Sequence, residues 1–375
     1  MTRAPDVVVI GGGIVGASAA SFLARAGAHV MLVEREALAA GASGRNSGVV
    51  QHPFDPVLAD LHLETVRLYR ELAAAGRPSR FRIPHRPSGL LYVAADAARV
   101  ASLADRLIED QPDLDPTYLA PGDVTRLEPA LRPEIAGCRL AIGYPVAPAA
   151  ATLAYAEDAR RAGAIIEIGV DARPWLDRRG VAGVRVGDRT VPAGAVVVTA
   201  GPWSPEVVDP AGRWRPIGRS WGVVVDVGLP APPRHVLEEL DVEAAIEPDG
   251  GGVGGLGFSL VPADGSSSLG STFLPRRPDP EAVVPALRER GSRFVPAIAI
   301  ARRGVVRVCA RPVSRDGRPL VGMLPWQPGL FLAAGHGPWG ISTGPASGRL
   351  VADLVLGRVR RPPRELEPGR FGEPA

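Results

Sequence analysis

Three glycines and one carboxylate near the start of the chain have the spacing of a nucleotide site. Gly11 permits a tight turn, Gly13 places no Cβ in front of a pyrophosphate, and Gly16 lets a helix pack closely on a strand. The start of that helix offers free N–H groups to phosphates. Glu34 follows about 20 residues later, where a carboxylate accepts hydrogen bonds from ribose hydroxyls and disfavours a 2′-phosphate. The pattern predicts a dinucleotide site and argues against NADP.

A strand, a helix and a second strand must hold these residues in place. Residues 7–10 read Val-Val-Val-Ile, an unbroken β-branched run that is typical of a strand buried on both faces of a parallel sheet. A helical pattern of small and apolar residues follows and stops at Gly27. A second apolar run over 29–33 leads into Glu34. These segments together predict a βαβ unit.

The composition excludes several kinds of chemistry. The chain has 43 basic and 40 acidic residues, a net charge of +3 and no long basic run, so we expect no nucleic-acid partner. Every basic residue is arginine, which rules out a Schiff-base lysine and the lysine of a phosphate-binding P-loop. The two cysteines are too few for a disulfide framework or a metal-ligand set. We therefore expect no metal and a reducing compartment.

The length and hydropathy of the chain are those of a globular protein. At 375 residues, with 46% hydrophobic and 22% charged residues, it is long enough for two domains or one elaborated domain. No apolar segment approaches the roughly 18 residues of a membrane span. The glycine motif begins at Gly11, which leaves no room for a cleaved signal peptide before it. We expect a cytoplasmic protein without a membrane span.

A loop dense in small and hydrogen-bonding side chains follows the acidic residue, and it reads Ser-Gly-Arg-Asn-Ser-Gly over 43–48. This string resembles the D-amino acid oxidase, glycine oxidase and sarcosine oxidase family of flavoproteins. In that family the loop runs under the pyrophosphate and along the isoalloxazine ring, so the resemblance implies FAD as the cofactor. The cofactor contacts expected in this half of the motif are Gly11, Gly13, Ile14, Val15, Gly16, Glu34, Arg35, Ser43, Gly44, Arg45, Asn46 and Ser47.

Two later strand patterns return the chain to the nucleotide-binding unit. A helical pattern over 151–162 precedes a strand pattern over 164–170, which makes Val170 a candidate for packing on adenine. The apolar run from 195 ends in Ala200-Gly201 and resembles a family landmark that brings backbone close to the pyrophosphate. Trp203 follows it directly and is expected to contact the cofactor too.

A second glycine-rich turn lies near the C-terminus. The apolar run 329–334 predicts a buried strand, the segment 335–341 a turn, and 343–356 a helix. N–H groups at such a helix start stabilise negative charge that develops on the N1–C2=O edge of a reduced flavin. The expected contacts are Gly335, Gly337, Gly340 and Ile341, with His336 and Trp339 flanking the ring.

The segment around Arg311 resembles the signature that binds substrate in this family, Arg-Pro followed by Asp-Gly-x-Pro. The resemblance implies that Arg311 holds the substrate carboxylate, because a guanidinium matches two oxygens bidentately. The alternative is an arginine in a structural ion pair. Cys309 stands where sarcosine oxidases hold the cysteine bonded to the flavin. We expect non-covalent FAD, with a bond to Cys309 as the alternative.

His52 closely follows the Ser-Gly-Arg-Asn-Ser-Gly loop and is expected to emerge beside the flavin. A histidine in this position could orient the substrate. The alternative is a histidine that is bonded to the backbone of its own loop. The candidate catalytic residues are thus Arg311, His52, His336 and Trp339.

The resemblance spans almost the whole chain and implies an α/β fold. It comprises a Rossmann-like FAD-binding domain of the glutathione-reductase type and a discontinuous α+β substrate domain with an antiparallel sheet. Further helical patterns at 57–72, 97–109 and 281–294 fit this architecture. The expected boundaries are 1–83, 145–212 and 307–375 for the FAD-binding domain, and 84–144 and 213–306 for the substrate domain.

The implied reaction is oxidation of the C–N bond of an amino acid or related amine. Hydride would pass to flavin N5, and the resulting imine would hydrolyse. Residues 45–49 also resemble the L-2-hydroxyglutarate-oxidising branch, so an FAD-dependent 2-hydroxy-acid dehydrogenase is the first alternative. An RNA-modifying flavoenzyme and a flavin-binding protein without turnover are further alternatives.

The electron acceptor is left open between oxygen and another compound. Oxidases of this family commonly place a lysine over the flavin, and this chain has none. An arginine could take that place. The substrate side chain, its chirality and the oligomeric state are open as well.

Overall fold

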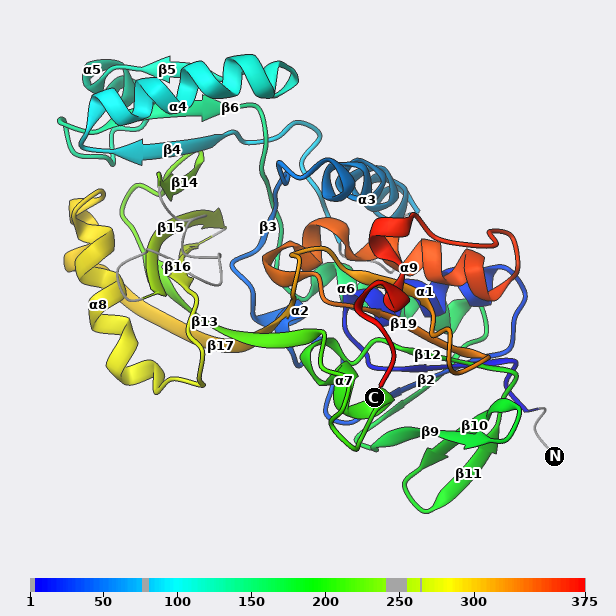
Figure 1. Ribbon diagram of the computed structural model, residues 1–375. Helices are drawn as coiled ribbons and strands as arrows, with labels where there is room; N and C mark the ends of the chain where they lie inside the picture. The colour runs from blue at the N-terminus through cyan, green and yellow to red at the C-terminus, as the bar shows by residue number, and fades with distance from the viewer. Residues whose placement is uncertain (1–3, 76–80, 241–254, 264, 375) are drawn as a thin grey trace.

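The computed structural model describes residues 4–75, 81–240, 255–263 and 265–374, which form two large sheets (Figure 1). The first sheet has six strands in the order β18-β19-β12-β1-β2-β8. All neighbours in it are parallel except β18 and β19. Its strands are β1 (Val7–Ile10), β2 (Val30–Glu34), β8 (Ile165–Ile168), β12 (Ala195–Val198), β18 (Leu320–Met323) and β19 (Leu330–Ala334).

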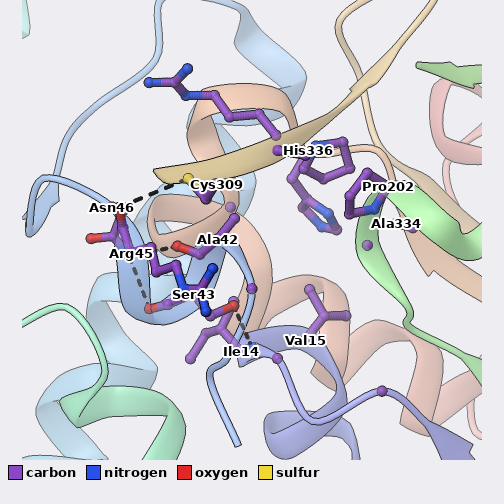
Figure 2. A pocket seen from close by; sticks show the side chains of 18 of the residues that line it. Ile14, Val15, Ala42, Ser43, Arg45, Asn46, Pro202, Cys309, Ala334 and His336 are labelled. Carbon is purple, nitrogen blue, oxygen red and sulfur yellow. Dashed lines mark hydrogen bonds between the residues drawn. The ribbon is translucent and has the colours of Figure 1, made fainter. Parts of the chain in front are cut away.

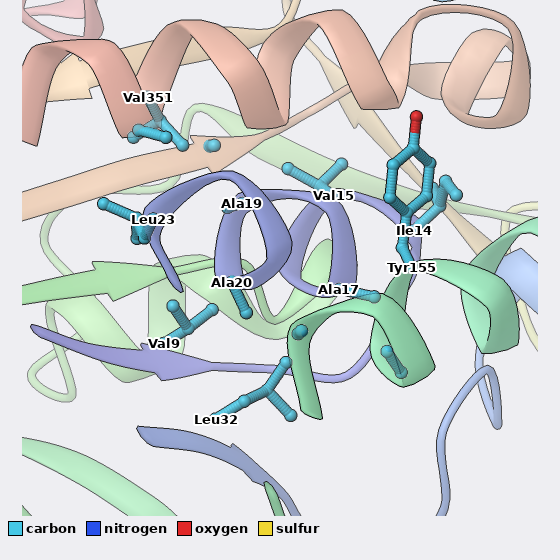
Figure 3. Packing of buried hydrophobic residues seen from close by; sticks show 14 of the residues in the cluster. Val9, Ile14, Val15, Ala17, Ala19, Ala20, Leu23, Leu32, Tyr155 and Val351 are labelled. Atoms are coloured by element: carbon cyan, nitrogen blue, oxygen red, sulfur yellow. The ribbon is translucent and has the colours of Figure 1, made fainter. Parts of the chain in front are cut away.

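The predicted βαβ unit is β1, α1 (Ile14–Arg25) and β2, and both faces of its strands are buried. Val9 and Leu32 pack against α1, as Figure 3 shows. Val8 and Met31 face the opposite side, where they pack in a cluster with residues of a small three-stranded sheet. That burial on two sides explains the unbroken apolar runs. The small sheet consists of β9 (Ala172–Asp177), β10 (Gly180–Val186) and β11 (Arg189–Pro192).

The second large sheet has eight strands in the order β17-β13-β16-β15-β14-β4-β6-β5. Its neighbours are antiparallel except β14 and β4. The strands are β4 (Leu90–Ala94), β5 (Thr117–Leu119), β6 (Ala136–Leu140), β13 (Ile217–Gly228), β14 (Val236–Glu239), β15 (Leu256–Ala263), β16 (Ser266–Thr272) and β17 (Arg302–Ser314). A two-stranded pair, β3 (Val49–Val50) and β7 (Tyr144–Pro145), completes the described strands.

Alternate residues of β13 face opposite sides of the eight-stranded sheet. Val223, Val225 and Val227 are buried in a cluster with Val284 and Leu287 of α8 (Pro280–Ser292). Val224, between the first two of these valines, faces the other side and lines the cavity described below. Helix α8 therefore seals the outer face of the sheet and leaves the inner face to build a site.

The longer of the remaining helices lie close to where the sequence patterns predict them, whereas the short α2 (Ala42–Arg45) and α7 (Ser204–Val208) have no predicted counterpart. Helix α3 begins after Asp55, whose carboxylate accepts hydrogen bonds from the backbone N–H groups of Val57 and Leu58. No helix within the described residues is long and apolar enough to cross a membrane. The helices are α2 (Ala42–Arg45), α3 (Pro56–Ala74), α4 (Ala97–Asp110), α5 (Pro121–Leu127), α6 (Ala150–Arg161), α7 (Ser204–Val208) and α9 (Gly340–Val355).

Strand β17 is the element that the sequence pattern least suggests. Its arginines interrupt the apolar run, and it contains Pro312. Because β17 is at the edge of the sheet, a proline costs it little. The boundary expected between residues 306 and 307 falls inside this strand. We propose that the substrate domain instead keeps β17 through Ser314.

Candidate active site

A cavity of about 460 Å³ lies between the carboxyl ends of the parallel strands and the inner face of the eight-stranded sheet. Such a crevice is where open α/β sheets bind ligands. Figure 2 shows part of its wall. The predicted contacts that line it are Gly11, Gly13, Ile14, Val15, Glu34, Arg35, Ser43, Arg45, Asn46, Ser47, Val170, Ala200, Gly201, Trp203, Gly337, Gly340 and Ile341. Arg311, His336 and Trp339 line it as well.

The first glycine turn is packed too tightly for side chains. Gly11 has a φ of +114°, and a Cβ on it would lie 2.6 Å from the carbonyl oxygen of Thr199. A Cβ on Gly16 would lie 1.9 Å from the carbonyl oxygen of Gly11. The Thr199 hydroxyl donates to the carbonyls of Ile10 and Gly11, at 3.0 Å each. Gly16 does not line the cavity, so its role is the close approach of α1 to β1.

The carboxylate of Glu34 is held at the end of β2. Its Oε2 accepts from the N–H of Gly12 at 2.7 Å, and its Oε1 accepts from the N–H of Glu36 at 2.9 Å. The neighbouring Arg35 places its guanidinium 4.3 Å from the centre of the Trp203 ring. Glu34, an acceptor for ribose hydroxyls, and Trp203, a flat aromatic surface, thus line the same cavity, and this combination suits a nucleotide.

The loop that resembles the flavoprotein motif is held to α1 by side chains. Ser43 Oγ accepts from the N–H of Ile14 at 2.9 Å, a contact drawn in Figure 2. Asn46 Nδ2 donates to the carbonyls of Ala42 and Ser43, while its Oδ1 accepts from the N–H of Gly48. Asn46 therefore fixes the shape of the loop as well as lining the cavity.

Besides Gly16, two further predicted glycine contacts do not line the cavity. A Cβ on Gly44 would lie 2.4 Å from the carbonyl oxygen of Ala39, so a larger residue would push the loop apart. Gly335 has a φ of +94° and lies close to Leu320 and Ser314. Both glycines shape the turns that carry the lining residues.

His336 lies in the cavity wall as a buried, neutral ring. Its Nε2 lies 2.9 Å from the hydroxyl oxygen of Ser347. Burial lowers the pKa of His336 to about 4. The ring therefore carries no charge near neutral pH. It adds no positive charge beside the N–H groups at the start of α9.

His52 does not line the cavity, contrary to its expected place beside the flavin. Its ring centre lies 5.0 Å from that of His62, and burial lowers the pKa of both rings, that of His62 to about 3. Gln51 lines the cavity instead. Consecutive residues after β3 point to opposite sides, and the strand pairing decides which of the two enters.

Arg311 projects into the cavity without an acidic partner among the described residues. Its Nη1 donates to the carbonyl of Thr272 at 2.6 Å, and its Nη2 donates to Ser271 Oγ at 3.1 Å. The guanidinium lies 4.5 Å from the centre of the Phe273 ring. Burial lowers its pKa, yet an arginine keeps its charge in proteins. A half-buried cation that meets only neutral groups suits an anionic ligand.

The space beside Arg311 depends on one glycine of the neighbouring strand. A Cβ on Gly222 would lie 2.7 Å from both terminal guanidinium nitrogens. Strand β13 therefore needs a glycine where the arginine crosses it. The sequence offered no sign of this contact, because it depends on the pairing of β13 with β17.

Cys309 lines the cavity close to the flavoprotein loop. Its Sγ lies 3.8 Å from the carbonyl oxygen of Arg45 and points toward it, as Figure 2 shows. Burial raises the pKa of the Cys309 thiol, while nearby arginines oppose that shift. The thiol rather than the thiolate is therefore favoured.

The inner face of the eight-stranded sheet supplies several lining residues that sequence reasoning did not identify. They come from strands of unremarkable sequence, or from segments directly after them. Polar residues inside strand patterns were the only available signal. These residues are Trp221, Glu238, Ser259, Ser271, Phe273 and Arg277.

Comparisons with known proteins agree with this arrangement. A family model described as FAD dependent oxidoreductase matches residues 6–354. A glycine oxidase from Geobacillus kaustophilus is 30% identical over 373 residues, which cover 95% of this chain and 94% of the relative. A crystal structure of glycine oxidase from Geobacillus kaustophilus has a TM-score of 0.82 at 26% identity and covers 99% of this chain and 98% of that one.

A second solved structure has the same overall form. The iminodiacetate oxidase of Chelativorans sp. BNC1 has a TM-score of 0.82 at 25% identity, over 96% of this chain and 98% of that chain. The predicted fold class and the predicted FAD cofactor are confirmed by these matches. The chain belongs to the family of FAD-dependent oxidoreductases.

Proposed function

We propose that this protein oxidises the C–N bond of an amino acid or related amine that carries a carboxylate. The observation that carries the proposal is Arg311, a cavity-lining guanidinium without an acidic partner among the described residues. It can present two parallel N–H donors to a carboxylate. A glycine oxidase and an iminodiacetate oxidase among its relatives support this substrate class.

The residues of the cavity fit FAD. Gly11 and Gly13 leave room for a pyrophosphate at the start of α1, and Glu34 would accept from a ribose. Bound FAD supplies a hydride acceptor at flavin N5. The N–H groups at the start of α9 would face the negative charge that then develops.

The remaining wall would position the substrate and exclude water. Arg311 would hold the carboxylate, which fixes the carbon to be oxidised relative to the flavin. His336 is uncharged, so it and Trp339 would shape the wall without attracting the carboxylate away from Arg311. The imine product would hydrolyse after it leaves.

We also propose that FAD is bound without a covalent bond. The nucleophile for such a bond would be a thiolate, and burial disfavours the thiolate of Cys309. The thiol instead points to the carbonyl of Arg45.

The test is anaerobic bleaching of the bound flavin by amino acids, secondary amines and 2-hydroxy acids. Bleaching by amines supports the proposal, and bleaching by hydroxy acids alone would support the dehydrogenase alternative. No bleaching by any donor would favour binding without turnover, and salt-sensitive retention of tRNA would favour the RNA-modifying alternative.

A pair of variants tests the anchor. Arg311→Gln should raise KM about 10- to 100-fold, because it removes a charge-assisted pair. Arg315→Gln removes the same charge from an exposed residue outside the cavity and should leave KM unchanged. Equal KM values for the two variants would remove Arg311 from the proposal.

A further inference from the structure

The cavity contains a buried carboxylate as well as a guanidinium. Glu238 of β14 is 8% exposed and lines the cavity. Its Oε2 accepts from Gln51 Nε2 at 3.1 Å. Gln51 in turn donates its backbone N–H to Ser342 Oγ, at the start of α9, at 2.9 Å. The carboxylate is thus held in a fixed position relative to the helix that would face the flavin.

The strand order gives the separation of the two charges. Arg311 reaches from β17 across Gly222 of β13, and its guanidinium bonds to Ser271 and Thr272, at the end of β16. Glu238 stands on β14, two strands further along the same sheet. Neighbouring strands are about 4.8 Å apart, so the backbone that carries Glu238 lies about 10 Å from the strand to which the Arg311 guanidinium is bonded.

The register places Glu238 on the cavity side of the sheet. Glu238 is paired with Ser259, and Ser259 with Gly270. A Cβ on Gly270 would lie 3.1 Å from Ser259 Oγ, which shows that these positions share one face. Ser259 also lines the cavity. The two residues that lie level with Glu238 on the neighbouring strands, Ser259 and Gly270, are small, which leaves room for a ligand beside its carboxylate.

We propose that Glu238 binds a protonated nitrogen of the substrate while Arg311 binds its carboxylate. The inference rests on the function proposed above and narrows its substrate class. For two head groups spaced as the strands are, at about 10 Å, a hydrogen bond of about 3 Å at each end leaves about 4 Å between the nitrogen and the carboxylate oxygen. The preferred ligand is therefore an amino acid whose cationic nitrogen lies beyond the α-carbon, three to five bonds from the carboxylate carbon.

The test is a matched series of ligands titrated by calorimetry into FAD-loaded protein. The flavin is reduced beforehand, so that no ligand is oxidised during the titration. The amines are glycine, 3-aminopropanoate, 4-aminobutanoate and 5-aminopentanoate, and each is compared with the alkanoate of the same chain length. The measured quantity is the ratio of the two dissociation constants at each length.

The wild-type protein should bind the amine about 10- to 100-fold more tightly than the alkanoate at one of the three longer lengths, and not at glycine. Glu238→Gln should bring this ratio close to one at every length while alkanoate binding stays within about threefold. Glu238→Asp shortens the side chain by one methylene, so the preferred amine should become one carbon longer.

The matched control is Glu239→Gln. Glu239 is the next residue of β14, does not line the cavity, and pairs with Arg290 at 2.7 Å. Glu239→Gln removes the same charge as Glu238→Gln. The ratio of the two dissociation constants should nevertheless vary with ligand length as in the wild type.

Three results would overturn the inference, and they separate it from the proposed function. A flat ratio in the wild type, or a ratio that survives Glu238→Gln, would remove Glu238 while leaving the alkanoates bound at Arg311. Failure of every carboxylate to bind would overturn both proposals together. If Glu238→Gln does not retain FAD, the wild-type profile and Glu238→Asp still decide the question.

Discussion

Gly222→Ala should weaken carboxylate binding without touching the ligand. The added Cβ would lie 2.7 Å from Nη1 and Nη2 of Arg311, a distance at which one of the groups must move. The guanidinium is the far end of a flexible side chain, so it would move at little cost to stability. It would then leave Thr272 and Ser271, which hold it at 2.6 and 3.1 Å.

The expected loss of affinity follows from the hydrogen bond between Arg311 and the ligand carboxylate, which the displaced guanidinium would no longer make. A hydrogen bond to a charged group contributes about 1.5–3 kcal/mol, which is about 10- to 150-fold in a dissociation constant. Titration of FAD-loaded Gly222→Ala with butanoate, followed by flavin absorbance, should show a loss in this range. The melting temperature should change little, because alanine is at least as well suited to a strand as glycine.

The matched control lies on the same strand. A Cβ on Gly218 would lie 3.8 Å from the carbonyl oxygen of Val313, an ordinary contact, so Gly218→Ala should bind butanoate as the wild type does. Wild-type affinity in Gly222→Ala would refute the reasoning, because it would show that the guanidinium does not need its present position.

Other expected outcomes concern pH, the cofactor and stability. Because the pKa of His336 is lowered from 6.5 to about 4, the unfolded chain binds more protons than the folded chain between these values. His336 alone should lower the free energy of unfolding by about 3 kcal/mol as pH drops from 6.5 to 4, and the buried His52 and His62 should add to this loss. Denaturant titrations of His336→Asn should lack the part of the pH slope that His336 contributes. Acid precipitation should release all FAD from the wild type, as from Cys309→Ser; flavin retained in the wild-type pellet alone would show a covalent bond. Asp55→Ala removes the N-cap of α3 together with the ion pair to Arg318 and should lower the free energy of unfolding by about 1–2 kcal/mol in urea titrations, whereas Asp55→Asn loses the ion pair and should keep most of the cap.

The nucleotide-binding half of the site could be predicted because its signals are local. The strand β1, the glycine turn and α1 are consecutive, and both faces of β1 are buried, so the apolar run and the glycine spacing are visible without any partner. Gly11 needs its positive φ whatever surrounds it. The same reasoning found the turn that carries His336.

The substrate half could not be predicted to the same extent, since its residues meet only through strand pairing. Glu238 enters the cavity because β14 joins β15 on one side and β4 on the other. Gln51 rather than His52 lines the cavity because alternate residues from Val49 onward face it. A strand of two residues is too short for its sequence pattern to show which of its faces is turned to the cavity. Arg311 was identified by resemblance, but the glycine that makes room for it was not.

The placement of the cavity wall on distant parts of the chain has a consequence for biosynthesis. The wall includes Ile10 at one end of the sequence and Ser342 at the other. Strand β12 joins β1 to β19, so the order of the six-stranded sheet requires a segment that leaves the ribosome late. A nascent chain that ends before His336 has the glycine turn but lacks the lining residues of the segment 336–342. Loading of the cofactor should therefore follow synthesis of nearly the whole chain, and folding intermediates should be exposed to the quality-control machinery without it.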